Sequence, residues 1–400
     1  MHPHRRAVRV LVLAFLLSNT GSGIASVALA YLVYDRTGSA VWLAATLLFN
    51  FGITGFLTPV AGHIADRFDR RRVMIVSDAL SAAIWVAFVF VREPAALVAL
   101  GFVASIASLP FWFAVDAAIP NLVPEEDLPW ANGTIGAARS VSKIAGPALG
   151  GLLYTAADGP GVAFAINAGS FVVSAAIVST IRGVAFSRPR AGSEADEFRG
   201  ALKGFSVLVH DRMLRALFVA WTLSFLGMNV AFVADPPLAR SFGVGAVGYG
   251  LIDTCFGAGA LVGALLARRT SADDERRWVA VGLGGVAIGW FLIAGAPVFS
   301  LVLAASALAA AMDALGGVAF YGIVQRRSQD AVRGRVFAAL AMAGLMANTV
   351  GFVIVGPLVE WLGPKAVYAL GGVVMVIATF SFWLPTSADR IRTAAATDEA

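Results

Sequence analysis

The chain carries little charge. Only 14% of its 400 residues are charged, whereas 58% are hydrophobic. A soluble protein normally has about a quarter of its residues charged, because its surface must be hydrated. A water-soluble globule is therefore excluded, and lipid must be the solvent. The 42 glycines agree with this, since small residues let membrane helices approach one another closely.

Metal-binding and nucleotide-binding groups are also scarce. The single cysteine, Cys255, lies in an apolar run, which excludes an internal disulfide and a thiolate cluster. The four histidines fall in polar segments outside the expected spans, so no histidine relay or imidazole metal site is expected within the membrane. No GxxxxGK[ST] loop occurs, so direct use of ATP is not expected. The sequence predicts no metal and no cofactor.

The chain is predicted to be an all-α membrane protein with twelve transmembrane helices. A bilayer core of about 30 Å needs apolar runs of about 20 residues. Such runs lie near 8–34, 40–61, 73–91, 95–119, 130–155 and 160–182, and then near 213–236, 245–267, 278–296, 298–322, 334–360 and 364–384. This predicts an N-terminal six-helix bundle (1–182), a cytoplasmic linker (183–212), a C-terminal six-helix bundle (213–386) and a cytoplasmic tail (387–400).

The basic residues predict the orientation. Of the 30 Lys and Arg residues, only Arg36, Arg92, Arg240 and Lys365 fall in loops expected outside. Arg139 and Lys143 lie within a span, and the others gather on the opposite side. The positive-inside rule then places both termini in the cytoplasm of a multi-pass protein of the cell membrane. Because the arginines form no basic face with interleaved aromatics, no nucleic-acid partner is expected.

The two halves resemble each other. Gly62, expected to open the loop after span two, corresponds to Gly263, and Gly146-Pro147 in span five corresponds to Gly356-Pro357 in span eleven. Two repeated six-helix bundles around a midplane site are a known architecture for alternating access.

The segment from Gly62 to Arg72 (GHIADRFDRRR) contains the strongest local signal. It resembles the loop signature of the major facilitator superfamily between spans two and three. A glycine permits a tight turn, an aspartate can cap a helix, and a basic cluster holds the loop inside. The resemblance implies a twelve-helix transporter in which this loop is a conformational latch. The latch residues are Gly62, Asp66, Arg67, Arg70 and Arg71. Asp69 stands where the family usually has glycine, which leaves the turn geometry open.

A second signal lies in span five, from Ser142 to Gly151 (SKIAGPALGG). It is similar to the antiporter signature of the same superfamily, which is typical of exporters, although Ser142 replaces a commoner glycine. Packing of small residues alone would give a similar pattern. The residues of this motif are Ser142, Gly146, Pro147, Gly150 and Gly151.

Charged side chains within the spans are costly and should face a cavity or a partner. Arg139, Lys143, Gly146 and Gly150 are spaced for one helix face, which we expect to look inward. Lys143 and Asp253 fall at one predicted depth, and Arg139 and Asp313 at another. Lys143 and Asp253 could pair as a gate or as a permanent structural ion pair. Asp116 and Asp235 lie nearer the span ends, where their carboxylates can reach water.

Polar and aromatic side chains within spans could contact a substrate. Three aromatics in a row, Phe111 to Phe113, cannot all face one side, so part of this segment must meet lipid or another helix. The asparagines could instead bond neighbouring helices. The candidate substrate contacts are Asn19, Trp112, Trp221, Asn229 and Asn348.

Together with the segments 120–132 and 325–336, these motifs resemble the drug:proton antiporter branch that includes macrolide and enterobactin exporters. The resemblance implies a monomeric secondary transporter whose partners are a small-molecule substrate, protons and the lipid bilayer, and which moves amphipathic compounds outward by alternating access. An importer or a lysolipid-type flippase of the same fold is the alternative. A polytopic membrane enzyme is disfavoured, because no paired His/carboxylate motif or G-x-S-x-G elbow occurs.

Overall fold

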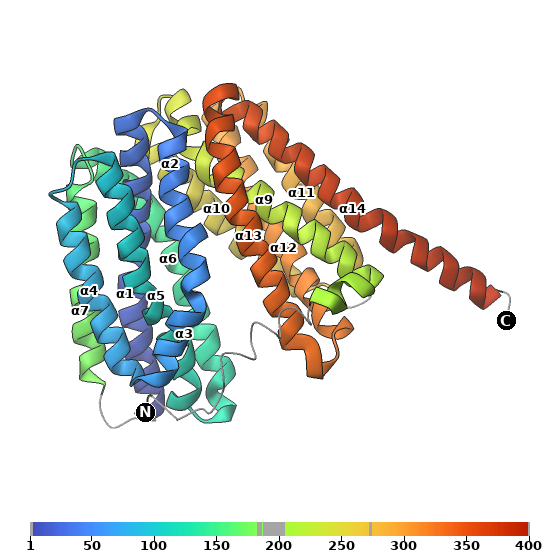
Figure 1. The fold of residues 1–400 in the computed structure, drawn as a ribbon, viewed down its shortest axis with the longest axis horizontal. Coiled ribbons are helices and arrows are strands. Elements are labelled where there is room, and N and C mark those ends of the chain that lie inside the picture. Colours follow the sequence, from blue (N-terminus) through green and yellow to red (C-terminus); the bar gives the residue numbers. More distant parts are fainter. Residues whose placement is uncertain (1–2, 182–185, 187–204, 272–273, 399–400) are drawn as a thin grey trace. The chain divides into compact units, whose positions relative to one another are not determined.

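The computed structural model describes residues 3–181, 186, 205–271 and 274–398. Within these residues every regular element is a helix (Figure 1). Chain contacts divide the protein into two compact units. The N-terminal unit comprises Met1–Ala191 and Pro236–Thr254, and the C-terminal unit comprises Gly192–Asp235 and Cys255–Ala400.

The N-terminal unit contains six long helical segments, drawn in blue to green in Figure 1. Their bounds are α1 Pro3–Thr37, a compound segment Ala40–Arg67, α4 Arg70–Phe88, α5 Pro94–Leu122, α6 Leu128–Ala156 and α7 Gly161–Thr180. A short 3₁₀ turn, η3 (Glu125–Asp127), precedes α6. The predicted spans agree with these helices to within about six residues at each end.

The compound second segment changes helix type along its length. It runs through α2 (Ala40–Leu47), the π-helix η1 (Leu48–Ile53), the 3₁₀ helix η2 (Thr54–Leu57) and α3 (Thr58–Arg67). The Thr54 hydroxyl donates to the Phe49 carbonyl oxygen within the irregular stretch, at 2.6 Å. Such π-type turns accommodate a locally misaligned hydrogen-bond ladder.

The expected role of Gly62 in a turn is wrong. Gly62 lies inside α3 and does not open a loop, and His63, also expected outside the spans, follows it in the same helix. The chain turns after Arg67, at Phe68 and Asp69. Helix α3 continues past Gly62 and ends at the polar residues Asp66 and Arg67.

The second half of the chain contains six more long helices. Their bounds are α9 Arg212–Ser241, α10 Gly245–Ala267, α11 Glu275–Ala294, α12 Phe299–Arg327, α13 Asp330–Leu362 and α14 Pro364–Asp398. Among the described residues, ten helical segments are long and apolar enough to cross a membrane. The other two are α4 and α6, which carry Asp78, Arg139 and Lys143. The twelve-helix fold predicted from the sequence is thus confirmed.

The unit boundaries differ from the predicted domain boundaries. Residues 236–254, the end of α9 and the first part of α10, group with the N-terminal unit, although they follow the expected linker. Most of that linker, 183–185 and 187–204, lies outside the described residues. The expected tail after residue 386 begins as a continuation of α14, which runs through Pro385 to Asp398.

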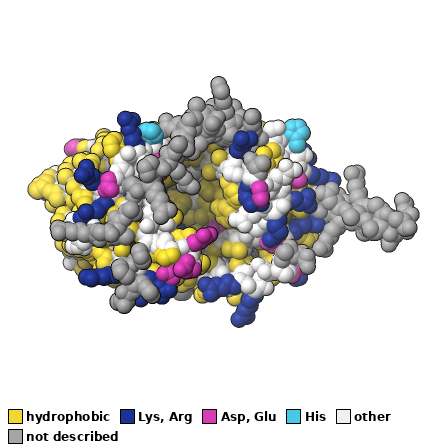
Figure 2. Space-filling model, turned by 90° about the horizontal axis from the view of Figure 1, so that it is seen from below, with side chains coloured by type: hydrophobic (Ala, Val, Ile, Leu, Met, Phe, Trp, Pro, Cys, Tyr) yellow, Lys and Arg dark blue, Asp and Glu magenta, His cyan; other side chains and the backbone are white. Residues whose placement is uncertain are grey.

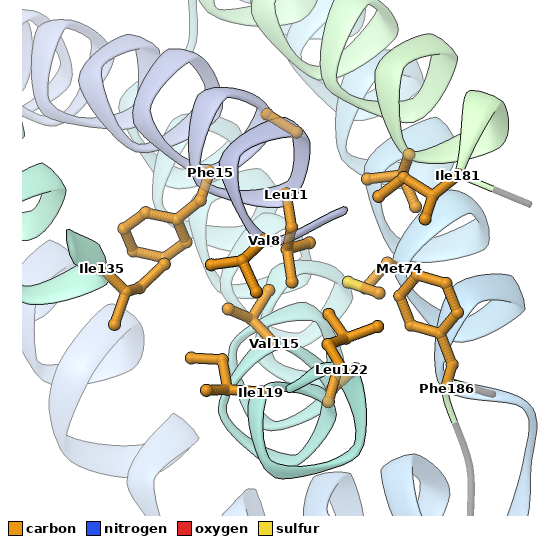
Figure 3. Packing of buried hydrophobic residues seen from close by; sticks show 14 of the residues in the cluster. Val8, Leu11, Phe15, Met74, Val115, Ile119, Leu122, Ile135, Ile181 and Phe186 are labelled. Atoms are coloured by element: carbon orange, nitrogen blue, oxygen red, sulfur yellow. The ribbon is translucent and has the colours of Figure 1, made fainter. Parts of the chain in front are cut away.

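The N-terminal unit has a core of aliphatic and aromatic side chains from α1, α4, α5, α6 and α7. Val8, Leu11, Phe15 and Val115 pack together in it, and Ile181 and Phe186 close one side (Figure 3). The C-terminal unit has its own core around Leu217, Phe320, Leu340 and Phe382. Each unit therefore buries its own apolar surface.

Helices α1 and α6 pack closely because glycines lie where they meet. A Cβ atom at Gly146 would lie 2.9 Å from the Cα of Gly23, and one at Gly150 would lie 2.6 Å from the Ile24 carbonyl oxygen. Both α6 glycines are buried. They face α1, the helix whose Phe15 ring also lies beside the Arg139 guanidinium.

Replacing Gly150 by alanine should lower the free energy of unfolding by about 1–3 kcal/mol, because the new methyl group would overlap backbone atoms of α1. The matched control is Gly136→Ala in the same helix, where a Cβ atom meets nothing within 4 Å. Thermal unfolding in detergent measures both variants. Equal melting temperatures for the two variants would contradict the packing argument.

Candidate functional site

The loop between α3 and α4 is held by side-chain bonds to backbone. Asp69 is the N-cap of α4, and its carboxylate accepts a hydrogen bond from the Arg72 backbone N–H at 3.0 Å. Its φ of −59° lies outside the left-handed region, so this turn does not require the glycine that the family usually has there. The question left open by the sequence is answered by a capping aspartate.

Arg70 is buried and anchors this loop to two other segments. Its Nη1 donates to the carbonyl oxygens of Ala117 (2.8 Å) and Phe186 (3.1 Å), and its Nη2 lies 3.3 Å from Asp66. Its side chain is 6% exposed. Arg71 donates to the carbonyls of Val178 and Ser179 at the end of α7. The predicted latch residues Arg70 and Arg71 therefore bind backbone within the N-terminal unit.

The remaining latch residues are more exposed. Arg67 lies over the Phe68 ring at 6.0 Å, and the Asp66 side chain is 58% exposed. Lys and Arg side chains, dark blue, stand on the face of the molecule seen in Figure 2. Exposed arginines beside an acidic residue can exchange partners at little cost, as a latch requires.

The span-five motif contacts helices on two sides. The Ser142 hydroxyl accepts from Thr20 of α1 at 3.1 Å. On the other side, a Cβ atom at Gly151 would lie 2.4 Å from the Ala246 carbonyl oxygen of α10. The Thr254 hydroxyl donates to the Ile144 carbonyl oxygen at 3.1 Å, three residues before Pro147. Pro147 has no N–H to bond the Lys143 carbonyl oxygen, which lies one residue before the carbonyl that Thr254 contacts.

Arg139 lies between an acid and two aromatic rings. Its guanidinium pairs with Asp116 of α5 and lies 5.5 Å from the Phe15 ring centre and 5.6 Å from that of Trp112. The two rings meet edge to face at 5.2 Å. The partner of Arg139 within its own unit is thus Asp116. Asp116, expected to reach water at a span end, is half-exposed and ion-paired.

A small cavity of about 10 Å³, enough for a water-sized group, lies beside this group, within the N-terminal unit. Its lining residues come from α1, α5 and α7 and are Phe15, Ser18, Asn19, Ser22, Ser108, Phe111, Trp112 and Phe171. The hydroxyls of Ser18, Ser22 and Ser108 donate to carbonyls of their own helices. Among the described residues the Asn19 side chain has no hydrogen-bond partner, so its amide is available to a ligand.

Lys143 and Asp253 lie near enough to interact electrostatically, and the Tyr249 hydroxyl bonds the Asp253 carboxylate. No direct ion pair joins Lys143 to an acid among the described residues. Lys143 is exposed and Asp253 is half-buried. Lys143 and Asp253 are therefore near each other but do not form a direct ion pair.

The other predicted residues lie in the C-terminal unit. Asp235 is 4% exposed and accepts a hydrogen bond from Tyr368 of α14, so it does not reach water at a span end as expected. Trp221 stacks on Phe320 at 4.3 Å, and the buried Asn229 donates to the Phe225 carbonyl oxygen of its own helix. Asp313 is exposed and Asn348 is half-buried.

Sequence reasoning missed several residues that contact the candidate charges, and one buried charge. Phe15 contacts Arg139, Tyr249 and Thr254 flank Asp253, and Asp78 is a buried carboxylate in α4. Asp78 had a signal, because it is the one acidic residue within the apolar run 73–91. The others had none, since hydroxyl and aromatic residues are common in spans.

A bundle of long apolar helices with charges and a pocket inside is the architecture of a membrane transporter. The Major Facilitator Superfamily model matches residues 11–234 and 217–399. The chain belongs to the major facilitator superfamily, as its motifs predicted.

Relatives and a solved structure agree with this assignment. The chain is 30% identical over 340 residues to the uncharacterised MFS-type transporter YfiS of Bacillus subtilis, covering 80% of this chain and 79% of that one. It is 26% identical over 385 residues to the multidrug efflux pump Tap of Mycobacterium tuberculosis, covering 90% and 88%. The nucleoside transporter NupG has a similar fold, with a TM-score of 0.71 at 15% identity over 95% and 99% of the two chains.

Replacing Arg70 by lysine should lower the free energy of unfolding by about 1–3 kcal/mol. Lysine has a single ammonium group, so it cannot reproduce the bonds to both carbonyls and Asp66, and buried acceptors lose their donor. The control is Arg72→Lys, at an exposed position two residues further on. Thermal unfolding compares the two. A loss no larger for Arg70→Lys than for Arg72→Lys would mean that the anchor does not stabilise the bundle.

Proposed function

We propose that this transporter is a proton-coupled exporter of small amphipathic compounds and that its substrate contacts the pocket of the N-terminal unit. The Arg139–Asp116 ion pair beside the Phe15 and Trp112 rings carries the proposal. The protein acts as a monomer in the cell membrane, with both termini in the cytoplasm.

The chemistry of the pocket fits an amphipathic ligand. The Phe15, Phe111 and Trp112 rings offer apolar area for an aromatic or lipophilic body. Asn19 offers an unbonded amide, and Asp116, whose side chain is 56% exposed, can accept a hydrogen bond or pair with a cation. A ligand with a cationic or hydrogen-bonding group on an apolar body therefore matches this surface best.

The exposed ion pair could respond to a ligand. Arg139 and Asp116 neutralise each other. A cationic ligand would compete with Arg139 for Asp116, and an anionic one would compete with Asp116 for Arg139. Either exchange changes the contacts between α5 and α6, which links binding to a movement of these helices.

The direction of transport rests on two similarities. The motif from Ser142 to Gly151 is similar to the antiporter signature, and the relative Tap is a multidrug efflux pump. Import or lysolipid flipping by the same fold stays the alternative, which a transport assay can distinguish.

Proton coupling is assigned to Asp253. Tyr249 donates to its carboxylate and Lys143 lies nearby without a direct ion pair. A carboxylate placed beside Tyr249 and Lys143 can gain or lose a proton when the contacts around it change. The change of charge would alter the attraction between α6 and α10.

Replacing Trp112 by alanine should lower the initial rate of uptake of ethidium or a macrolide about tenfold at subsaturating substrate. The physical reason is the loss of one aromatic contact, worth about 1.5–3 kcal/mol. Everted membrane vesicles containing the wild type should accumulate the same compounds, and the control Trp361→Ala, at an 81% exposed tryptophan of α13, should match the wild type.

Two results would overturn this assignment. The pocket is excluded if Trp112→Ala and Trp361→Ala transport equally well. Export is excluded if right-side-out cells, instead of everted vesicles, accumulate the substrate, and translocation of a labelled lysophospholipid alone would favour the flippase.

Replacing Asp253 by asparagine should abolish the dependence of vesicle uptake on the pH gradient, because the amide cannot exchange a proton. The control Asp158→Asn alters an exposed acid in the α6–α7 turn, at φ 50°, a conformation that asparagine also tolerates. Uptake is measured before and after the gradient is dissipated. In a double-mutant cycle of Lys143→Ala and Asp253→Ala, additive effects would remove the proposed coupling between them.

A further inference from the structure

Outside the pocket, α4 and α7 enclose a polar cluster that transport through the pocket does not use. Asp78 and Ser81 of α4 are 1% and 0% exposed, and Asn167 and Ser174 of α7 are both 0% exposed. Ser174 is the residue whose hydroxyl approaches the Asp78 carboxylate. Neither carboxylate oxygen, nor either serine hydroxyl, completes a hydrogen bond of ordinary geometry within the described chain.

The two helices are fixed to each other on both sides of Asp78. Towards the start of α4, Arg71 donates to the carbonyls of Val178 and Ser179. Towards its end, Trp85 and Phe88 pack on Phe164 of α7, with ring centres 5.3 and 5.2 Å apart. Asp78 lies between these two contacts, about 12 Å from Arg70 along the helix. It is therefore held in a closed interior and cannot swing out to water.

Within the described part of the chain, no charged side chain neutralises Asp78. Helix α7 contains no charged residue, and the charged residue of α5, Asp116, pairs with Arg139. Among the described residues, Ser174 is the side chain that interacts with the buried Asp78 carboxylate. The charged or titratable residues of α3 and α4 act elsewhere or lie towards the loop, and they are His63, Asp66, Arg67, Arg70, Arg71 and Arg72.

An ionised carboxylate in such an interior needs a positive charge, because burial without one is strongly unfavourable. The groups of this cluster without a hydrogen-bond partner are four oxygens, two of Asp78, one of Ser81 and one of Ser174, and the amide nitrogen of Asn167. Oxygen ligands with a single negative charge suit a small, hard cation of charge +1 and leave the site neutral. A divalent ion would leave an excess positive charge in the same apolar surroundings.

We propose that Asp78, Ser81 and Ser174 form a binding site for one small monovalent cation, a sodium ion or a proton, between α4 and α7. The site is separate from the pocket and from the Lys143–Asp253 pair. Occupancy stabilises the folded bundle, because the unfolded chain exposes Asp78 to water and binds the cation less tightly.

The test is the melting temperature of the purified full-length protein in detergent. It is measured with sodium chloride against choline chloride at equal ionic strength, at pH 6 and pH 8.5. Asp78→Asn, which keeps the shape of the protonated acid, is compared with the wild type. Ser174→Ala is the second variant, and Ser170→Ala is the control, since the Ser170 hydroxyl is already bonded to the Asn167 carbonyl oxygen of its own helix.

A bound sodium ion predicts that sodium raises the melting temperature of the wild type and Ser170→Ala by at least about 2 °C at pH 8.5, and that the shift is lost in Asp78→Asn and reduced in Ser174→Ala. A bound proton predicts no sodium effect, but a melting temperature that falls from pH 6 to pH 8.5 more in the wild type than in Asp78→Asn, because the folded state then holds a proton that the unfolded state releases.

The site is refuted if the wild type and Asp78→Asn respond equally to sodium and to pH. If Asp78→Asn does not fold, the melting-temperature shifts of Ser174→Ala and Ser170→Ala with sodium and with pH are compared instead, and equal shifts refute the site. Transport need not be measured, so this outcome is independent of the substrate pocket.

Discussion

Hydrocarbon neither donates nor accepts hydrogen bonds, and this constraint governs the structure. Every backbone N–H and C=O within the membrane must find a partner inside the protein, which favours long helices throughout. Hydroxyl side chains obey the same rule by bonding their own helix, as Ser22 does with Ser18 and Thr222 with Phe218. Where the ladder is irregular, a hydroxyl supports it, as Thr54 of η2 does by donating to the Phe49 carbonyl oxygen of η1.

Several basic side chains among the described residues donate to backbone carbonyls. Arg70 and Arg71 donate to carbonyls of α5, of Phe186 and of the end of α7, and Lys365 donates to the Ala296 carbonyl oxygen just after α11. The carboxyl end of a helix carries partial negative charge and unbonded carbonyls, so basic side chains are stabilised there. The same positive charges that orient a membrane protein thus also hold its helix ends.

The sequence predicted the helices well because apolar length is a direct measure of a span. For α10 the predicted and observed bounds, 245–267, coincide. The second segment was harder to predict, because no residue pattern in Leu48–Ile53 distinguishes a π-helix from an α-helix. Gly62 is also compatible with either a helix or a turn. Whether a glycine permits a turn or a close helix contact can be decided only when its neighbours in space are known. Gly146 and Gly150 are examples, since their neighbours are Gly23 and Ile24 of α1.

The candidate site was predictable by residue type but not by pairing. Intramembrane Arg139, Asp116, Trp112 and Asn19 were each singled out, and the structure places them together with Phe15. Helical rise along the chain estimates depth, but it gives no rotation about the axis, so Arg139 was matched in depth with Asp313 instead of with Asp116. The partner of Asp235 was unpredictable for the same reason, because Tyr368, which donates to its carboxylate, lies 133 residues away in the sequence.

The contacts of Arg70 have a consequence for the evolution of this fold. Its two shortest bonds end on main-chain carbonyls, which exist whatever side chains occupy positions 117 and 186. Those positions can therefore vary without disturbing the arginine, and substitutions at 70 need no compensating change there. Related sequences should show no correlated variation between Arg70 and these two contacts, so methods that infer proximity from covariation would overlook an anchor that joins three segments of the chain.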